Sequence, residues 1–319
     1  YTCITLIDKS ISTDVLKYFK LNEINTLEKH TFSEYHYTDF PDGKPWRMRE
    51  SGIDEIIHKL ESSGTPLSHW KIRNGLATLK NDLYFFSPVK EDTKYYYRKY
   101  NGKSYKIEKN ICIKVAKPNI IKSEAELEQK MEIAIFPYTH MGSSYQLIEE
   151  DVFKFSFPEA YSFLTEYKSL LLNRDKGHGN YPTWYAYGTT QGMNNFGKKL
   201  LIPYISGNPV AVLSLDPDVL FYCGYALLSE DIEELKILKV FLESEAFWYY
   251  IFHTSKPYSK GYMSFAKNYI VNFTIPTLSK KEKSYLLTPH SREELNKFVW
   301  EKYDIYNDKK NVMEGSKKA

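Results

Sequence analysis

A short turn between two glycines carries side chains of the types that read nucleic-acid bases. Its sequence is Gly188-Thr189-Thr190-Gln191-Gly192. Glutamine can pair with adenine through two hydrogen bonds, and threonine offers a hydroxyl and a methyl group. The turn therefore predicts contact with base edges. The alternative is a connecting turn whose threonine hydroxyls bond the backbone.

Two adjacent lysines follow this turn and precede an apolar run. Lys198 and Lys199 come directly before Leu200-Leu201-Ile202-Pro203, which is typical of a buried strand. Lysine is a common contact of the DNA phosphate backbone. The pair predicts a phosphate clamp, and a solvated strand start explains it equally well.

A third candidate is the loop 256–262, whose sequence is Lys-Pro-Tyr-Ser-Lys-Gly-Tyr. Its proline and glycine favour an irregular backbone. Lys256 and Lys260 supply positive charge, and Tyr262 can pack against a nucleic-acid backbone or base. The loop predicts DNA contact, with a structural crossover loop as the alternative.

Hydrophobic periodicity predicts the elements that must position these segments. Helices are expected over 53–62, 155–172 and 231–253, and strands over 71–78, 82–86, 111–115, 131–138, 184–187, 199–205, 210–215 and 219–227. Asn101-Gly102 between two β-prone runs predicts a hairpin over 93–107. Its basic residues could enter a groove as a two-stranded ribbon, although an ordinary exposed hairpin is the favoured interpretation.

Strands come first and helices gather late in the chain, which predicts an α+β fold: a mixed β-sheet domain with a C-terminal group of helices. Ser279 with Glu282 and Ser291 with Glu294 have the spacing of capping boxes and predict two C-terminal helix starts. The apolar stripe from Leu235 to Tyr249 is expected to lie in the core, with its lysines facing solvent.

Composition sets limits on the class of protein. The net charge is +3, which is mildly basic, so any DNA-binding face must come from cations collected on one side. Cys3, Cys112 and Cys223 lack metal-ligand spacing and are odd in number, which indicates a reducing compartment without disulfides. No apolar run approaches the roughly 20 residues of a membrane helix. These features predict a cytoplasmic protein that does not contact a membrane.

The order of several segments resembles the C-terminal specificity domain of TaqI-type adenine-specific DNA methyltransferases. Related domains occur in fused restriction-modification enzymes and in specificity subunits of type I systems. The resemblance covers roughly residues 45 to 305 and rests on the segments 157–161, 170–175, 181–206, 236–245, 261–265 and 275–276. It implies a domain that reads double-stranded DNA.

The resemblance also implies a domain organisation and a further set of contacts. Residues 1–20 are expected to be the tail of a missing catalytic domain, 21–50 a linker, 51–305 the target-recognition domain with lobes at 51–150 and 151–305, and 306–319 a disordered tail. The position of the family's first recognition loop is occupied by Lys71, Arg73, Asn74 and Thr78. Where the family usually has arginine after the glycine of the second loop, this chain has Thr189.

Catalytic motifs are missing from the sequence. There is no glycine-rich turn for S-adenosylmethionine and no Asn/Asp-Pro-Pro-Tyr/Phe loop, and the eight histidines show no metal-ligand spacing. We therefore assign no catalytic, cofactor or metal residue to this chain. S-adenosylmethionine and an adenine methyltransferase activity, with or without a fused nuclease, are expected of the full-length protein, whose catalytic domain would be a partner in the same polypeptide.

Three other functions fit the sequence less well. A type I specificity subunit would need a second recognition domain and long spacer helices. A complete enzyme would need a cofactor site that the motifs do not show. A binder of single-stranded RNA is suggested only by the 28 tyrosines, which an A·T-rich genome also explains.

Overall fold

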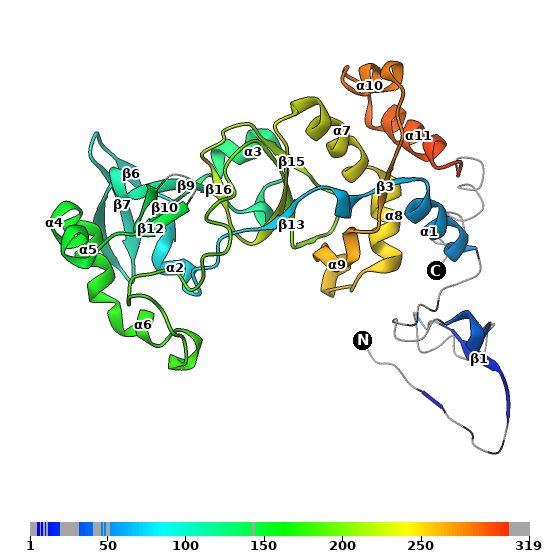
Figure 1. Ribbon diagram of the computed structural model, residues 1–319, viewed down its shortest axis with the longest axis horizontal. Helices are drawn as coiled ribbons and strands as arrows, with labels where there is room; N and C mark the ends of the chain where they lie inside the picture. Colours follow the sequence, from blue (N-terminus) through cyan, green and yellow to red (C-terminus); the bar gives the residue numbers. More distant parts are fainter. Residues whose placement is uncertain are drawn as a thin grey trace.

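The computed structural model of this 319-residue chain describes residues 5, 6, 8, 10, 12–19, 32–40, 46, 48, 52–141 and 144–305. It has an α+β fold, as predicted, with a β-rich lobe, a central sheet and a helical lobe placed side by side along the longest axis (Figure 1). No helix within the described ranges has the length and apolar character needed to cross a bilayer.

The central sheet is antiparallel and has the strand order β15-β13-β17-β4. Its strands are β4 (Ile72–Asn74), β13 (Lys199–Pro203), β15 (Val212–Ser214) and β17 (Gly224–Leu228). Successive side chains of a strand point to opposite faces. Leu200 and Leu227 accordingly join the core of the helical lobe, whereas Leu201 and Ala226 join a smaller core on the other face. β4 is an edge strand of this sheet.

Helices α1 (Ile53–Ser62), α7 (Ile232–Leu242), α8 (Glu245–Thr254), α9 (Lys267–Ile270), α10 (Lys280–Leu286) and α11 (Arg292–Lys302) form the helical lobe. Two short strand pairs accompany them, namely β3 (Gly64–Pro66) with β19 (Thr274–Pro276) and β14 (Ile205–Ser206) with β18 (Met263–Ser264). The predicted helix 53–62 and both predicted capping boxes are confirmed.

The single long helix predicted over 231–253 is wrong, because α7 ends before Ser244 and α8 begins after it. The buried Ser244 Oγ accepts a hydrogen bond from Phe247 N at 3.2 Å and donates one to Phe241 O at 2.6 Å. A serine hydroxyl that bonds both helix ends stabilises a break that the apolar periodicity alone does not reveal.

Two sheets build the β-rich lobe. One has the order β16-β9-β10-β5, and the other is β6-β7-β8. The strands are β5 (Phe85–Phe86), β6 (Lys90–Glu91), β7 (Tyr95–Tyr100), β8 (Lys103–Glu108), β9 (Cys112–Ala116), β10 (Glu132–Ile135) and β16 (Leu220–Phe221), with a separate pair β11 (Tyr138–Met141) and β12 (Ser144–Leu147). The helices α2 (Asn81–Tyr84), α4 (Glu150–Ser156), α5 (Pro158–Glu166) and α6 (Lys168–Leu172) complete the lobe, and α3 (Glu124–Gln129) lies near the central sheet.

The predicted hairpin is confirmed as β7 and β8, joined by Asn101 and Gly102 with φ of 47° and 78°. Two of its basic side chains have partners within the lobe, whereas Lys94 and Lys99 are exposed. Arg98 is buried and donates to Leu83 O at 2.6 Å, and burial lowers its pKa to about 10. Lys103 lies 2.5 Å from a carboxylate oxygen of Glu166. Both of these cations therefore have partners within the lobe.

The core does not divide at residue 150, where the two lobes were expected to meet. The β-rich lobe buries Phe86 from before that position together with Phe163, Tyr187 and Leu220 from after it. The helical lobe combines α1 with residues beyond 199. The chain therefore passes between the lobes more than once, and the segments at these crossings lie next to the central sheet.

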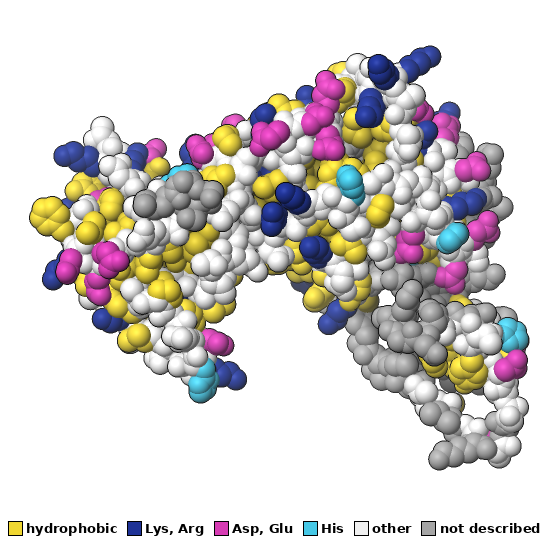
Figure 2. All heavy atoms as spheres, viewed as in Figure 1, with side chains coloured by type: hydrophobic (Ala, Val, Ile, Leu, Met, Phe, Trp, Pro, Cys, Tyr) yellow, Lys and Arg dark blue, Asp and Glu magenta, His cyan; other side chains and the backbone are white. Residues whose placement is uncertain are grey.

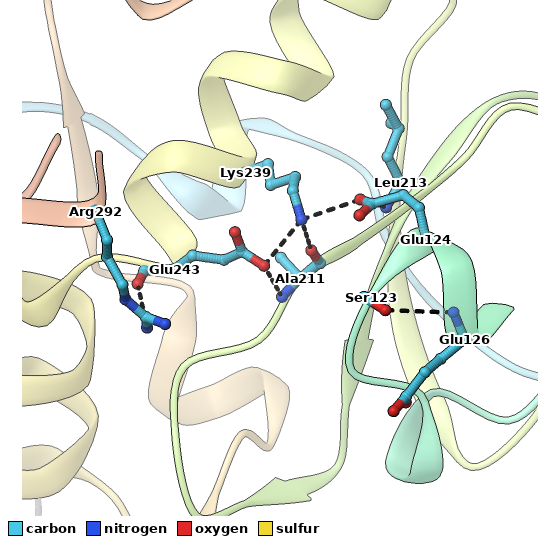
Figure 3. Close-up of polar contacts among 8 residues, drawn as sticks. All are labelled: Ser123, Glu124, Glu126, Ala211, Leu213, Lys239, Glu243 and Arg292. Atoms are coloured by element: carbon cyan, nitrogen blue, oxygen red, sulfur yellow. Dashed lines mark hydrogen bonds and ion pairs between the residues drawn. The ribbon is translucent and has the colours of Figure 1, made fainter. Parts of the chain in front are cut away.

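A polar cluster joins α3 to α7 (Figure 3). Lys239 Nζ lies 3.0 Å from Glu124 Oε1 and 2.9 Å from Glu243 Oε1, and it donates to Ala211 O at 2.7 Å. Lys239 is thus half-buried, whereas the lysines of the Leu235–Tyr249 stripe were expected to face solvent. The apolar members of that stripe are buried, as predicted.

Near the N-terminus, β1 (Val15–Tyr18) pairs antiparallel with β2 (Ser33–His36), across the expected boundary between tail and linker. Most of the linker 21–50 and the tail 306–319 lie outside the described residues.

Candidate nucleic-acid interface

Two segments that were predicted to read DNA lie next to each other in the structure. They meet at β4, the edge strand of the central sheet. The turn 188–192 lies on the segment 74–79 that follows β4. Gly188 N donates to Thr78 O at 3.1 Å, and Thr189 N donates to Ala77 O at 3.1 Å. The Asn195 side chain donates to Asn74 O at 2.7 Å. Segments more than a hundred positions apart in sequence thus form one surface.

Glycine is required where the two segments touch. Gly192 has φ of 80°, and a Cβ there would lie 2.6 Å from the carbonyl carbon of Gly75. A Cβ on Gly75 would lie 2.6 Å from Phe221 O of the neighbouring strand. Neither contact leaves room for a side chain, so these two glycines set how closely the turn approaches the sheet.

A buried arginine holds the backbone beneath this surface. Arg174 Nη1 donates to Thr78 O at 3.0 Å and to Ala186 O at 2.8 Å. Its Nη2 donates to Trp184 O at 3.1 Å, and its Nε to Leu171 O at 2.8 Å. The guanidinium presents five donors in a fixed planar geometry, which suits several carbonyls converging from different segments. It thereby fixes the end of the segment 71–79 and the residues just before the turn 188–192 relative to α6.

This arrangement explains why the strand predicted over 184–187 is wrong. The carbonyls of Trp184 and Ala186 bond to Arg174, and Tyr84 Oη donates to Tyr185 O at 2.9 Å. Their backbone groups are therefore satisfied by side chains and not by a neighbouring strand. The aromatic side chains of the segment are buried, which is what the apolar pattern detected.

The predicted contacts of this surface differ in accessibility. Solvent-exposed side chains belong to Lys71, Arg73, Asn74, Thr189, Thr190 and Gln191. In Figure 1 the chain from β4 to α2 runs along the lower edge of the molecule, between α6 and α9. Figure 2 shows this edge to be hollowed between the two projecting lobes. The segment from β4 to α2 therefore runs along a concave edge.

Two predicted contacts need correction because their side chains are interior. Thr78 is fully buried, and its hydroxyl donates to Asn81 Oδ1 at 2.7 Å. Lys199 is also fully buried, and its ammonium donates to Val219 O at 2.7 Å. Neither group reaches a phosphate from these positions. Lys198 is half-buried and lies 3.8 Å from a carboxylate oxygen of Glu230, so it is only partly available.

The third predicted segment forms an exposed loop beyond α8. Lys256, Lys260 and Tyr262 all have exposed side chains. The loop is closed by hydrogen bonds from Ser264 N to Lys256 O at 2.9 Å and from Tyr258 N to Tyr262 O at 2.6 Å. The pairing of β18 with β14 ties it to the helical lobe. It therefore belongs to a different lobe from the turn 188–192.

Sequence reasoning did not find the roles of Arg174 and Lys199. For Lys199 a signal exists, because a strand buried on both faces reads as a continuous apolar run, and this lysine begins such a run. For Arg174 a single sequence offers no signal, since its four partners are backbone carbonyls. Among the described residues no group of three or more His, Cys, Asp or Glu could hold a metal ion.

Comparison with known proteins supplies a relationship. A scan against protein-family profiles finds no match. The sequence is 25% identical, over an alignment of 224 residues that covers 65% of this chain, to the type II restriction enzyme and methyltransferase RM.Eco57I of Escherichia coli. The matched region spans only 22% of that enzyme's length. The chain is therefore a distant relative of a restriction-modification enzyme and corresponds to a small part of it.

Replacing Arg174 by methionine is expected to destabilise the fold strongly. The change removes four hydrogen bonds to buried carbonyls, and charged hydrogen bonds contribute about 1.5–3 kcal/mol each before losses overlap. We expect unfolding in urea to show a loss of about 3 kcal/mol or more. Arg292→Met is the matched control, because exposed Arg292 donates to one carbonyl, Glu243 O. Equal losses in the two variants would contradict the role assigned to Arg174.

Lys199 is expected to make stability rise with pH. Burial lowers its pKa from 10.5 to about 8. Between these values the unfolded chain holds more protons on this group than the folded chain, so the free energy of unfolding increases with pH. The difference in unfolding free energy between wild type and Lys199→Met should grow in favour of wild type across this window. Urea denaturation at several pH values measures it, and a flat difference would rule out the depressed pKa.

Proposed function

We propose that this chain is the DNA target-recognition part of an adenine-specific methyltransferase in a restriction-modification system, with a TaqI-like specificity domain. The observation that carries the proposal is the junction of the segments 71–79 and 188–195 on one exposed surface. The distant relationship to a type II restriction enzyme and methyltransferase supports it.

Two kinds of contact would contribute to DNA binding at this surface. Exposed Lys71 and Arg73, and Lys256 and Lys260 on the helical lobe, have the chemistry to bind phosphates and provide affinity that depends on salt. Hydrogen-bonding side chains on the turn 188–192 have the chemistry to read base edges. The hollow edge between the lobes offers a concave surface to a duplex (Figure 2).

Catalysis would lie elsewhere in the polypeptide. The chain carries neither a glycine-rich turn for S-adenosylmethionine nor a paired-proline loop for a flipped adenine. The catalytic domain of the same polypeptide would bind the cofactor and perform methyl transfer, while this part holds the duplex in register. The matched relative combines two activities in its name, which favours a fused enzyme over a type I specificity subunit.

Removing the exposed cations of the surface should reduce the salt dependence of duplex binding. Each phosphate contact contributes about −0.9 to the slope of log affinity against log salt, so Lys71→Ala and Arg73→Ala should each lower its magnitude by about 1. The protein encoded by the intact gene is titrated with duplex DNA at several salt concentrations. Lys281→Ala, an exposed cation on α10, is the control and should leave the slope unchanged. Slopes that are equal in all variants would place the duplex elsewhere.

Expression of the intact gene should give its host a new pattern of adenine methylation. Sequencing of modified bases should reveal one motif that is methylated only when the gene is present. Deleting residues 188–195 should abolish that pattern even if the protein remains soluble. A host genome without added N6-methyladenine would overturn the methyltransferase assignment.

A further inference from the structure

The side chain of Gln191 is both exposed and held in place. Its Nε2 donates to Gly75 O at 2.8 Å, and its backbone N donates to Thr189 Oγ1 at 3.1 Å. Gly75 N donates to Gly224 O of β17 at 3.3 Å, and Gly75 lies so close to β16 that a Cβ would be 2.6 Å from Phe221 O. The carboxamide is thus attached to a rigid part of the central sheet.

This attachment uses only one donor of the carboxamide. A primary amide has two N–H donors and one oxygen acceptor. The second N–H and Oε1 of Gln191 have no partner among the described residues, and the side chain is open to solvent. The group therefore offers an adjacent donor and acceptor whose orientation is restricted before any ligand arrives, and this lowers the entropy lost on binding.

Two of the neighbouring polar groups, Asn195 and Thr189, are less suited to the same task. Asn195 is buried, and its amide nitrogen donates to Asn74 O. The Thr189 hydroxyl accepts from Gln191 N and helps to shape the turn. A threonine hydroxyl has its donor and acceptor on one oxygen, whereas a carboxamide has them on two adjacent atoms. The hydroxyl therefore discriminates bases less strongly.

We propose that Gln191 determines one A·T base pair of the recognised sequence, by bonding the N6 amino group and N7 of adenine in the major groove. Adenine presents an acceptor at N7 beside a donor at N6, which complements the free N–H and Oε1 of a carboxamide. The hydrogen bond to Gly75 O holds the Gln191 side chain in place for this contact. The inference rests on the proposed function. It adds the identity of one residue that selects a base and of the base that this residue selects.

Selection from a randomised duplex library tests this assignment with the protein encoded by the intact gene. Wild type should enrich a motif that contains one strict A·T position. Gln191→Ala should reduce discrimination at that position by roughly 5- to 150-fold, as expected for loss of a bidentate base contact, and leave the other positions unchanged. Gln191→Glu, which keeps the shape but loses the amide donors, should also lose the adenine preference there. Gln129→Ala, an exposed glutamine on α3, is the matched control and should retain the full motif.

The outcomes separate this inference from the proposal on which it depends. An unchanged motif in Gln191→Ala would show that the side chain only anchors the turn. Loss of discrimination at several positions in both variants would indicate the same structural role and overturn the base assignment. A wild-type protein that enriches no motif would reject the DNA-recognition function itself.

Discussion

The candidate interface depends on how one buried guanidinium satisfies the backbone around it. Arg174 bonds carbonyls that come from the end of α6, from the segment after β4 and from the aromatic segment 184–186. Each of these interior carbonyls would lose one donor without Arg174, and a buried acceptor left without any donor costs about 1–3 kcal/mol. The side chain also stacks on Tyr181, with its guanidinium carbon 4.2 Å from the ring centroid. One ionised group thus determines where two distant segments meet.

The close approach of those segments has a steric basis as well. Gly75 and Gly192 meet back to back at the edge of the central sheet, and no other residue fits at either position. The turn is therefore carried by β4 and not by a flexible linker. A surface on a sheet edge gains precision, because the strands beneath it pack into the core of the helical lobe and into the smaller core on the other face.

Charge is distributed in a way that a net value of +3 does not reveal. Several lysines are committed to carboxylates, such as Lys106 to Glu159 at 2.8 Å and Lys109 to Glu91 at 2.7 Å. Lys199 is interior. The cations left exposed beside β4 are few, so affinity for a polyanion would rest on a small number of contacts and selectivity on hydrogen bonds from the turn.

The sequence by itself determined the features that depend on local interactions. The Asn101-Gly102 hairpin, the helix 53–62 and the two capping boxes follow from turn and cap chemistry within a few residues, and all are present. It also identified the exposed polar turn 188–192. Only the tertiary structure decided that Lys199 and Thr78 are buried, that the chain crosses between lobes repeatedly, and that Arg174 joins three segments. The burial of Thr78 and the contacts of Arg174 depend on backbone carbonyls and on distant residues, which leave no pattern in the order of side chains. For Lys199 the apolar run that it begins is a signal of burial, but the carbonyl that satisfies its ammonium comes from a distant segment.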